Sequence, residues 1–215
     1  LEPEPLCTLE TSAETVRYFE ELRADRPGDA RLDVFLGVNY DCCHLGVEFE
    51  EAGAALGRLR EAGVKVSKIH LSNALKIRPT AETLQSLAAF QDPVYFHQVV
   101  ARATDGSLAR IMDLPAALDP HSVIRDPKFE EWRIHYHIPL HSPPTVLFDT
   151  TAPHALGGLV AAHVTVAEAI ARLPEGDTAA GLWAEVAGEA ASLFTTSLLD
   201  ESLPPLSLPA REYPE

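Results

Sequence analysis

The sequence predicts an α/β protein in which short strands alternate with amphipathic helices around a parallel sheet. Three successive segments carry this prediction: an apolar strand run that ends at Asp41, a helical pattern over about residues 49–62, and a strand pattern at residues 64–71 directly after Gly63. Strand–helix–strand units with such short links form parallel pairs with right-handed crossovers. Because the carboxyl ends of parallel strands meet at one edge of a sheet, a functional site is expected there.

A helix is predicted from about residue 13 to residue 24. Thr11 and Glu14 have the spacing of a capping box, in which the hydroxyl and the carboxylate each accept a backbone N–H group. Three apolar residues then recur at helical spacing: Val16, Phe19 and Leu22. The strand that delivers Asp41 is predicted to cover residues 33–40.

The pattern changes after a helix predicted from Pro79 to about residue 90. Two strand-like runs at residues 94–100 and 108–112 flank Thr-Asp-Gly-Ser at residues 104–107, which is a hairpin signature. A hairpin within a strand–helix series is typical of an insertion at the loops that shape a site. We therefore expect an inserted β-hairpin over about residues 94–113.

A further strand is predicted at residues 132–140. Because side chains alternate along a strand, Arg133, His135 and His137 share one face and the apolar residues between them share the other. Strands of an α/β sheet are normally covered on both faces. The polar face is therefore expected to have a partner.

Alanine, glycine and leucine dominate residues 152–198, which are predicted to be helical. The Pro-rich segment 199–215 is expected to be poorly ordered. This division leaves residues 1–151 as the α/β region. Its opening Leu-Glu-Pro-Glu-Pro, without Met, suggests the exit of a strand that begins before residue 1.

The composition argues against several classes of function. With 32 acidic and 17 basic residues the formal net charge is −15, which is unfavourable for binding a nucleic-acid backbone. No uninterrupted apolar stretch approaches the ~18 residues that suggest a membrane span, and no secretory signal is evident. The chain has 3 cysteines, and an odd number with two adjacent is typical of reduced thiols. A cytoplasmic location is therefore expected.

The adjacent Cys42 and Cys43 have two interpretations. Next to His44 they could belong to a site for a thiophilic metal ion. Small buried apolar side chains are the favoured interpretation, because the sequence has no second cysteine pair to complete such a site.

Acidic and imidazole side chains stand at successive predicted strand ends. In chain order they are Glu2 or Glu4, Asp41 with His44, His70, and then His135, His137 and His141. A carboxylate–imidazole set without organised thiolates suits Mn²⁺, Mg²⁺, Co²⁺ or Zn²⁺. Such an ion would polarise a carbonyl or a pair of hydroxyls, and a nearby carboxylate would move a carbon-bound proton.

Each candidate also has an ordinary structural interpretation. Aspartates cap helices after strands, which would account for Asp41. His44 and His70 would then be packed histidines, and Glu2 would be a terminal charge. The histidines of the later strand would form a satisfied polar patch. The order of these residues along successive strand ends favours the metal site.

Five motifs resemble one known superfamily. They are Leu1–Pro5, Tyr40–His44, Lys68–Ser72, Phe96–Val100 and His135–Leu140. The first three are similar to strand ends in the second half of the xylose isomerase-like TIM barrels, which include sugar isomerases, epimerases and endonuclease-IV-type enzymes. Jointly the five resemble the C-terminal portion of the metabolite traffic proteins of the ebo cluster, over about residues 1–151.

This resemblance implies a partial (β/α) TIM-type barrel with the inserted hairpin and a helical C-terminal region. It also implies that Glu2, Asp41 and His70 bind a divalent metal ion. A partial barrel leaves strand edges unpaired. A homo-oligomer, or a partner that completes the barrel, is therefore expected.

The remaining roles complete the hypothesis. His44 is predicted to contact the substrate or support the metal, and with Glu2 it is the catalytic candidate; His135 and His137 are predicted to bind substrate. The leading hypothesis is a metal-binding sugar isomerase/epimerase-like protein that takes part in secondary-metabolite processing or traffic. Its substrate would be a small polyhydroxylated or phosphorylated compound, and the reaction would pass through an enediolate. The alternative is a non-catalytic binding or trafficking module that retains the barrel cavity. The alternative is supported by the lack of a counterpart in residues 152–215 for the superfamily's final-strand Glu.

Overall fold

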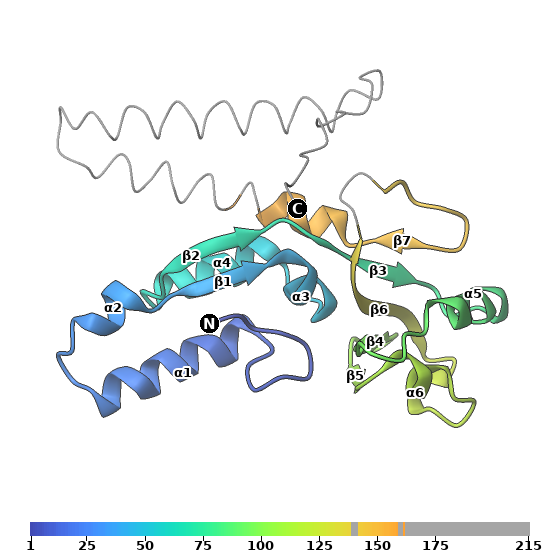
Figure 1. The fold of residues 1–215 in the computed structure, drawn as a ribbon, viewed down its shortest axis with the longest axis horizontal. Helices are drawn as coiled ribbons and strands as arrows, with labels where there is room; N and C mark the ends of the chain where they lie inside the picture. The colour runs from blue at the N-terminus through green and yellow to red at the C-terminus, as the bar shows by residue number, and fades with distance from the viewer. Residues whose placement is uncertain (139–141, 159–160, 162–215) are drawn as a thin grey trace, which may run out of the picture. The chain divides into compact units, whose positions relative to one another are not determined.

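The computed structural model describes residues 1–138, 142–158 and 161. The chain divides into two units, Leu1–Ala162 and His163–Glu215, and the described residues all belong to the first (Figure 1). Residues 152–158 are helical, as predicted, whereas most of the predicted helical region and the tail 199–215 lie outside the described residues. Within this described part, no helix combines the length and the apolar composition needed to cross a membrane.

The first elements surround a short parallel sheet (Figure 1). In chain order they are α1 (Ser12–Asp25), α2 (Arg31–Phe35), β1 (Val38–Asp41), α3 (Cys42–Val47), α4 (Ala52–Glu61) and β2 (Val66–His70). Strands β1 and β2 pair in parallel, and Asp41 lies opposite His70. The predicted strand–helix–strand unit is confirmed, and it brings two candidate ligands to the same end of one sheet.

The capping box predicted at the start of α1 is confirmed. The Glu14 N–H donates to Thr11 Oγ1 at 3.2 Å, and the Thr11 N–H donates to Glu14 Oε2 at 3.0 Å. Phe19 of the same helix is buried in a cluster with Val38 of β1 and Leu59 of α4. Helix α1 is thereby held against the parallel pair.

The strand predicted at residues 33–40 is wrong in its first half. Helix α2 forms there instead, and its Phe35 side chain is 78% exposed. Asp29 Oδ1 accepts the Arg31 N–H at 3.1 Å, a local turn hydrogen bond that favours a helical turn over an extended chain. Pairing with β2 therefore begins only at Val38.

Helix α3 has no counterpart among the predicted elements. Asp41 caps it, and all its residues are buried. The helix predicted at residues 49–62 begins later than expected, at Ala52, because the Glu51 carboxylate caps its first turn. It ends before Gly63, which adopts the left-handed conformation expected at a helix end, with φ 64°.

The next strands form an antiparallel sheet (Figure 1). They are β3 (Asn73–Ile77), β4 (Val99–Ala103), β5 (Leu108–Ile111), β6 (Phe129–Ile138) and β7 (Asp149–Thr150), in the order β5-β4-β6-β3-β7. Short helices occupy the connections: α5 (Ala81–Leu87), η1 (Ala88–Phe90), α6 (Leu114–Leu118) and η2 (Val123–Arg125). The helix predicted from Pro79 to residue 90 is thus present as α5 and η1.

The predicted partial (β/α) TIM-type barrel is wrong. Among the described strands, β1 and β2 are parallel, whereas every pairing among the other five is antiparallel. Parallel neighbours need a crossover of a dozen or more residues. Leu71 and Ser72 alone separate β2 from β3, so the alternation of strand and helix stops at His70. The expectation of a partner that completes such a barrel is withdrawn with it.

The predicted hairpin is confirmed as a hairpin but not as a barrel insertion. Strands β4 and β5 pair from Val99↔Ile111 to Arg102↔Leu108. Gly106 in the turn has φ 84°, a conformation that residues with a side chain rarely adopt. Because β4 also pairs with β6 over its whole length, the hairpin forms one edge of the main sheet.

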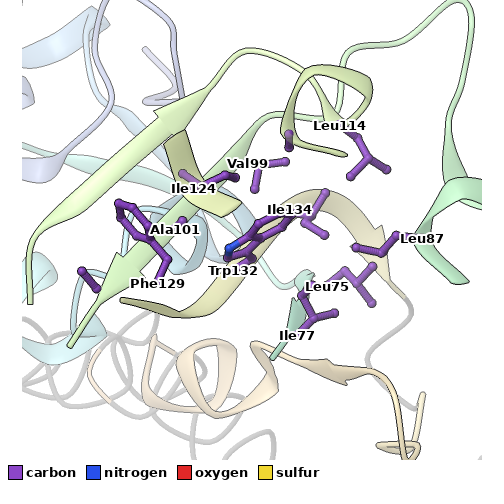
Figure 2. Packing of buried hydrophobic residues seen from close by; sticks show 12 residues of the cluster. Leu75, Ile77, Leu87, Val99, Ala101, Leu114, Ile124, Phe129, Trp132 and Ile134 are labelled. Carbon is purple, nitrogen blue, oxygen red and sulfur yellow. The ribbon is translucent and has the colours of Figure 1, made fainter. Parts of the chain in front are cut away.

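The two faces of β6 have the alternation that the sequence predicts. Trp132 lies in the buried apolar cluster shown in Figure 2. On the opposite face, Arg133 Nη1 donates to the Gly46 carbonyl of α3 at 2.5 Å. Helix α3 therefore supplies the expected partner of the polar face. Residues 139–141, which include the candidate His141, lie outside the described part.

Candidate metal centre

Asp41 ends β1 and lies at the centre of the candidate site. Its side chain is completely buried. Its Oδ1 accepts hydrogen bonds from Cys43 N–H at 2.8 Å, His44 N–H at 3.2 Å and Ser72 Oγ at 2.7 Å. Its Oδ2 has no hydrogen-bond partner, although His70 Nδ1 lies 2.5 Å away. One oxygen therefore caps α3, and the other faces the His70 ring nitrogen.

The surroundings of Asp41 keep it ionised. Burial by itself would raise the pKa of this carboxyl. The charge of His44, followed by the hydrogen bonds from Ser72 and the His44 N–H, outweighs burial and holds the pKa of Asp41 below its ordinary value. At neutral pH Asp41 therefore presents the charged form that binds cations.

His70 and His137 both lie close to the Asp41 carboxylate. His70 is brought there by the parallel pairing of β1 and β2, and His137 comes from β6 of the other sheet. Their rings stack with centroids 5.4 Å apart. One ligand atom from each of Asp41, His70 and His137 lies within 4.8 Å of the others. The three side chains could together hold one ion.

The amino-terminal segment places Glu2 beside the same carboxylate. The Asn39 N–H donates to the Leu1 carbonyl at 2.8 Å, so residues 1–3 run along β1. Glu2 Oε1 lies 3.9 Å from His44 Nδ1. Glu2, Asp41 and His44 form a second group whose ligand atoms lie within 4.8 Å of one another.

His44 is a buried histidine with one nitrogen engaged by the backbone. Its Nδ1 lies 3.0 Å from the Pro3 carbonyl, to which it can only donate. In the neutral ring this leaves Nε2 with a lone pair. The ring meets that of His135 edge-on at a centroid distance of 4.6 Å. His44 is therefore packed, and Nε2 of its neutral ring keeps a lone pair with which it could also support a metal, the two roles that the sequence left as alternatives.

His135 is oriented by Gln98, which no sequence signal singled out. His135 Nδ1 lies 2.8 Å from Gln98 Oε1, and its Nε2 lies 3.3 Å from His137 Nε2. Burial, followed by the charges of His44 and His137, lowers the pKa of His135 to about 3, and burial also lowers the pKa of His137. Both rings are neutral at pH 7, which is the state that binds metal ions.

The structure brings all six predicted site residues together, but it groups the ligands differently from the prediction. Glu2, Asp41 and His70 do not form one of the compact groups. Instead Asp41 belongs to two groups. One contains Glu2 and His44, and the other contains His70 and His137. Two further groups are present: Glu4 with His44 and His135, and Cys43 with His135 and His137.

Three contributors were missed or set aside by sequence reasoning. Ser72 donates to Asp41 and lies at the end of a motif that the sequence did single out. Gln98 likewise lies within a motif, but nothing in its spacing points to His135. Cys43 was favoured as a packing residue, and its position beside β6 depends on α3, which the sequence did not predict.

Comparison with protein-family models, curated proteins and solved structures found no match for this chain. The resemblance to the xylose isomerase-like superfamily therefore stays a prediction from motifs. The function has to be argued from the geometry of the histidine–carboxylate cluster.

Proposed function

We propose that the chain binds a divalent metal ion through Asp41, His70 and His137, with Glu2 and His44 beside it. The carrying observation is Asp41 Oδ2, a buried carboxylate oxygen that accepts no hydrogen bond and has the His70 Nδ1 atom 2.5 Å away. Buried charged atoms are ordinarily paired or bound to a metal, because leaving them unsatisfied costs several kcal/mol. An ion at Oδ2 would satisfy this atom while Oδ1 keeps its hydrogen bonds.

The donor set limits the kind of ion. One carboxylate and two imidazoles suit Zn²⁺, Co²⁺ or Mn²⁺, whereas Mg²⁺ prefers oxygen ligands throughout. The predicted Mg²⁺ is therefore the least favoured of the four candidate ions for this group. Glu2 lies close enough to add a second carboxylate to Asp41.

A small polyhydroxylated or phosphorylated metabolite is the proposed ligand of the bound ion. The side chains of His70 and Glu2 are each 44% exposed, so one side of the cluster faces solvent. Adjacent oxygens of such a compound would complete the coordination, and the ion would polarise them. Glu2 would then move a carbon-bound proton in an isomerisation or epimerisation, with His44 contacting the substrate. The resemblance adds secondary-metabolite processing or traffic as the context.

A binding or trafficking role without turnover is the second candidate. It is supported by the lowered pKa values of His135 and His137, which keep both rings neutral. Neutral imidazoles coordinate metals and make hydrogen bonds, so these two rings could hold a ligand without taking part in proton transfer. Such a site would hold a metal-bound metabolite without transforming it.

Metal content tests the proposal directly. The purified chain, stripped with chelator and reloaded with Mn²⁺, is expected to retain about one equivalent. Asp41→Asn keeps an acceptor for the helix cap but places an amide where the ion would bind, so affinity should fall at least about tenfold. Asp149→Asn, which changes a surface aspartate, is the matched control and should bind as the wild type does.

The outcomes separate the candidates. If the wild type holds no stoichiometric Mn²⁺, or if Asp41→Asn binds Mn²⁺ equally well, the proposed Asp41 site is wrong. If metal binds and sugars or sugar phosphates are isomerised, the enzyme is supported. Saturable metabolite binding to the loaded chain without turnover supports the binding module instead.

A further inference from the structure

Cys43 lies beside His135 and His137 of β6, where its thiolate could bind the same metal ion as the two imidazoles. A ligand atom from each of Cys43, His135 and His137 lies within 4.8 Å of the others. Cys43 is completely buried, and its Sγ donates to the Tyr136 carbonyl, between the two histidines, at 3.4 Å. The thiol therefore contacts the β6 backbone between the two histidines, while the Cys43 side chain also packs in a small apolar cluster with Val47 and Val100.

The neighbouring Cys42 behaves differently. Its side chain is equally buried, but it packs in the apolar cluster formed with α1 and α4, and it belongs to none of the candidate metal groups. The packing role that the sequence favours for both cysteines thus fits Cys42. Cys43 also packs in an apolar cluster, but of the two cysteines it alone has histidine nitrogens beside its sulfur, so the alternative of a thiophilic metal site applies to it.

The geometry of the two histidines matches a shared ion. With Nδ1 donating to Gln98 Oε1, the neutral ring of His135 directs the lone pair of Nε2 toward His137 Nε2, 3.3 Å away. Two imidazole nitrogens on one tetrahedral Zn²⁺, each at 2.0–2.1 Å, lie about 3.3 Å apart. Without metal, the distance of 3.3 Å between the two Nε2 atoms suits a hydrogen bond in which the Nε2–H group of a neutral His137 ring donates to His135 Nε2. Loading the pair therefore needs little movement.

We propose that Cys43, His135 and His137 form a thiolate subsite that selects Zn²⁺ or Co²⁺. This inference rests on the proposed metal-binding function and adds the ion's identity to it. As the metal–sulfur bond forms, the thiol proton leaves to solvent and the thiolate offers its electron pair to the ion. Soft thiolate ligands favour Zn²⁺ and Co²⁺ over Mn²⁺ and Mg²⁺.

The subsite competes with the Asp41 group for one ligand. His137 belongs to both groups, and a neutral imidazole has a single lone pair for a metal. A thiophilic ion is therefore drawn toward Cys43 and His135, whereas Mn²⁺ is drawn toward Asp41 and His70. The cluster therefore has two alternative metal positions, one that prefers Zn²⁺ or Co²⁺ and one that prefers Mn²⁺.

Cobalt spectroscopy on the reduced full chain tests the subsite. Co²⁺ is expected to give a thiolate-to-cobalt charge-transfer band in the near ultraviolet, and Cys43→Ser should abolish it. Cys42→Ala is the matched control and should keep the band. Absence of the band in the wild type, or its persistence in Cys43→Ser, overturns the subsite. Mn²⁺ affinity, measured by electron paramagnetic resonance, should be the same in Cys43→Ser as in the wild type, which also shows that the variant is folded.

X-ray absorption at the zinc edge provides a test without any variant. The wild-type chain with one equivalent of Zn²⁺ should show one sulfur scatterer at about 2.3 Å. If Zn²⁺ binds with nitrogen and oxygen scatterers alone, the thiolate subsite is wrong while the proposed metal function stands. If neither Zn²⁺ nor Mn²⁺ binds stoichiometrically, both proposals are wrong.

Discussion

At the scale of single residues, the two oxygens of Asp41 have different roles. One accepts the backbone N–H groups of α3 and the Ser72 hydroxyl, and the other is buried without a hydrogen bond. The capping and the metal interpretations of this residue are therefore compatible. The same carboxylate ends β1, starts α3 and supplies the free oxygen on which the proposed site depends.

Glu48 is a second buried carboxyl with a perturbed environment. Arg110 Nε donates to Glu48 Oε2 at 3.0 Å, and Glu10 Oε2 approaches the same nitrogen at 2.9 Å. Burial has the largest effect and raises the pKa, Arg110 lowers it, and Glu10 raises it again, so that the pKa of Glu48 is raised to about 7. The unfolded carboxyl has a pKa of about 4.3, so the folded chain holds this proton more tightly.

The stabilising contribution of Glu48 should therefore be lost as pH rises. It is complete below about pH 4.3 and disappears as the pH passes the folded pKa of about 7. Relative to Glu48→Gln, the wild type is expected to lose free energy of unfolding across this range, as measured by urea denaturation at several pH values. The exposed Glu82→Gln should show no such trend. A constant or rising difference for Glu48→Gln would contradict the raised pKa.

At the scale of elements, α1 depends on its capping box. Thr11 and Glu14 together satisfy N–H groups that have no partner within the helix. Thr11→Ala is expected to lower the free energy of unfolding by about 1 kcal/mol, measured by chemical denaturation. Thr8→Ala, an exposed threonine outside the helix, should change it by less than about 0.5 kcal/mol. Equal effects of the two variants would show that the cap does not stabilise the chain.

Element prediction succeeded where local signals agree and failed where they conflict. The cap of α1, the Gly-containing turn between β4 and β5, and the alternation of β6 are local patterns, and all three are confirmed. The apolar run before Val38 looks like a strand, but the turn hydrogen bond at Asp29 produces α2. Helix α3 escaped prediction because it is too short for a periodic pattern.

At the scale of the whole described unit, the proposed ligands come from distant segments. Asp41 and His70 end the two strands of the parallel sheet, and His137 comes from the antiparallel sheet. An ion bound to all three would link the two sheets. Because this arrangement exists only in the folded chain, metal binding should add to its stability.

Thermal unfolding measures this linkage. At a free Mn²⁺ concentration about 100 times the dissociation constant, the stabilisation is about 2.7 kcal/mol. For a chain of this size that corresponds to a rise in Tm of roughly 5–10 °C. Asp41→Asn should abolish the rise, and Asp149→Asn should keep it. A Tm that stays constant although Mn²⁺ is bound would mean that the unfolded chain binds the ion equally well, which contradicts a site assembled from distant segments.

The sequence by itself determined most of the local elements and named the candidate site residues. Parallel pairing followed from the short strand–helix–strand links, and it correctly placed Asp41 near His70. Glu2, His44, His135 and His137 were also named from their positions at or near predicted strand ends and on the polar face of one strand.

Only the tertiary structure decided how these residues meet. Periodicity records which face of a strand is buried, but not which distant strand it pairs with or in which direction. The antiparallel pairing of β3 with β6 replaced the expected barrel and brought His135 and His137 to the cluster. The burial of α3 against β6 turned Cys43 toward the same histidines. Both depend on long-range contacts that a local pattern does not contain.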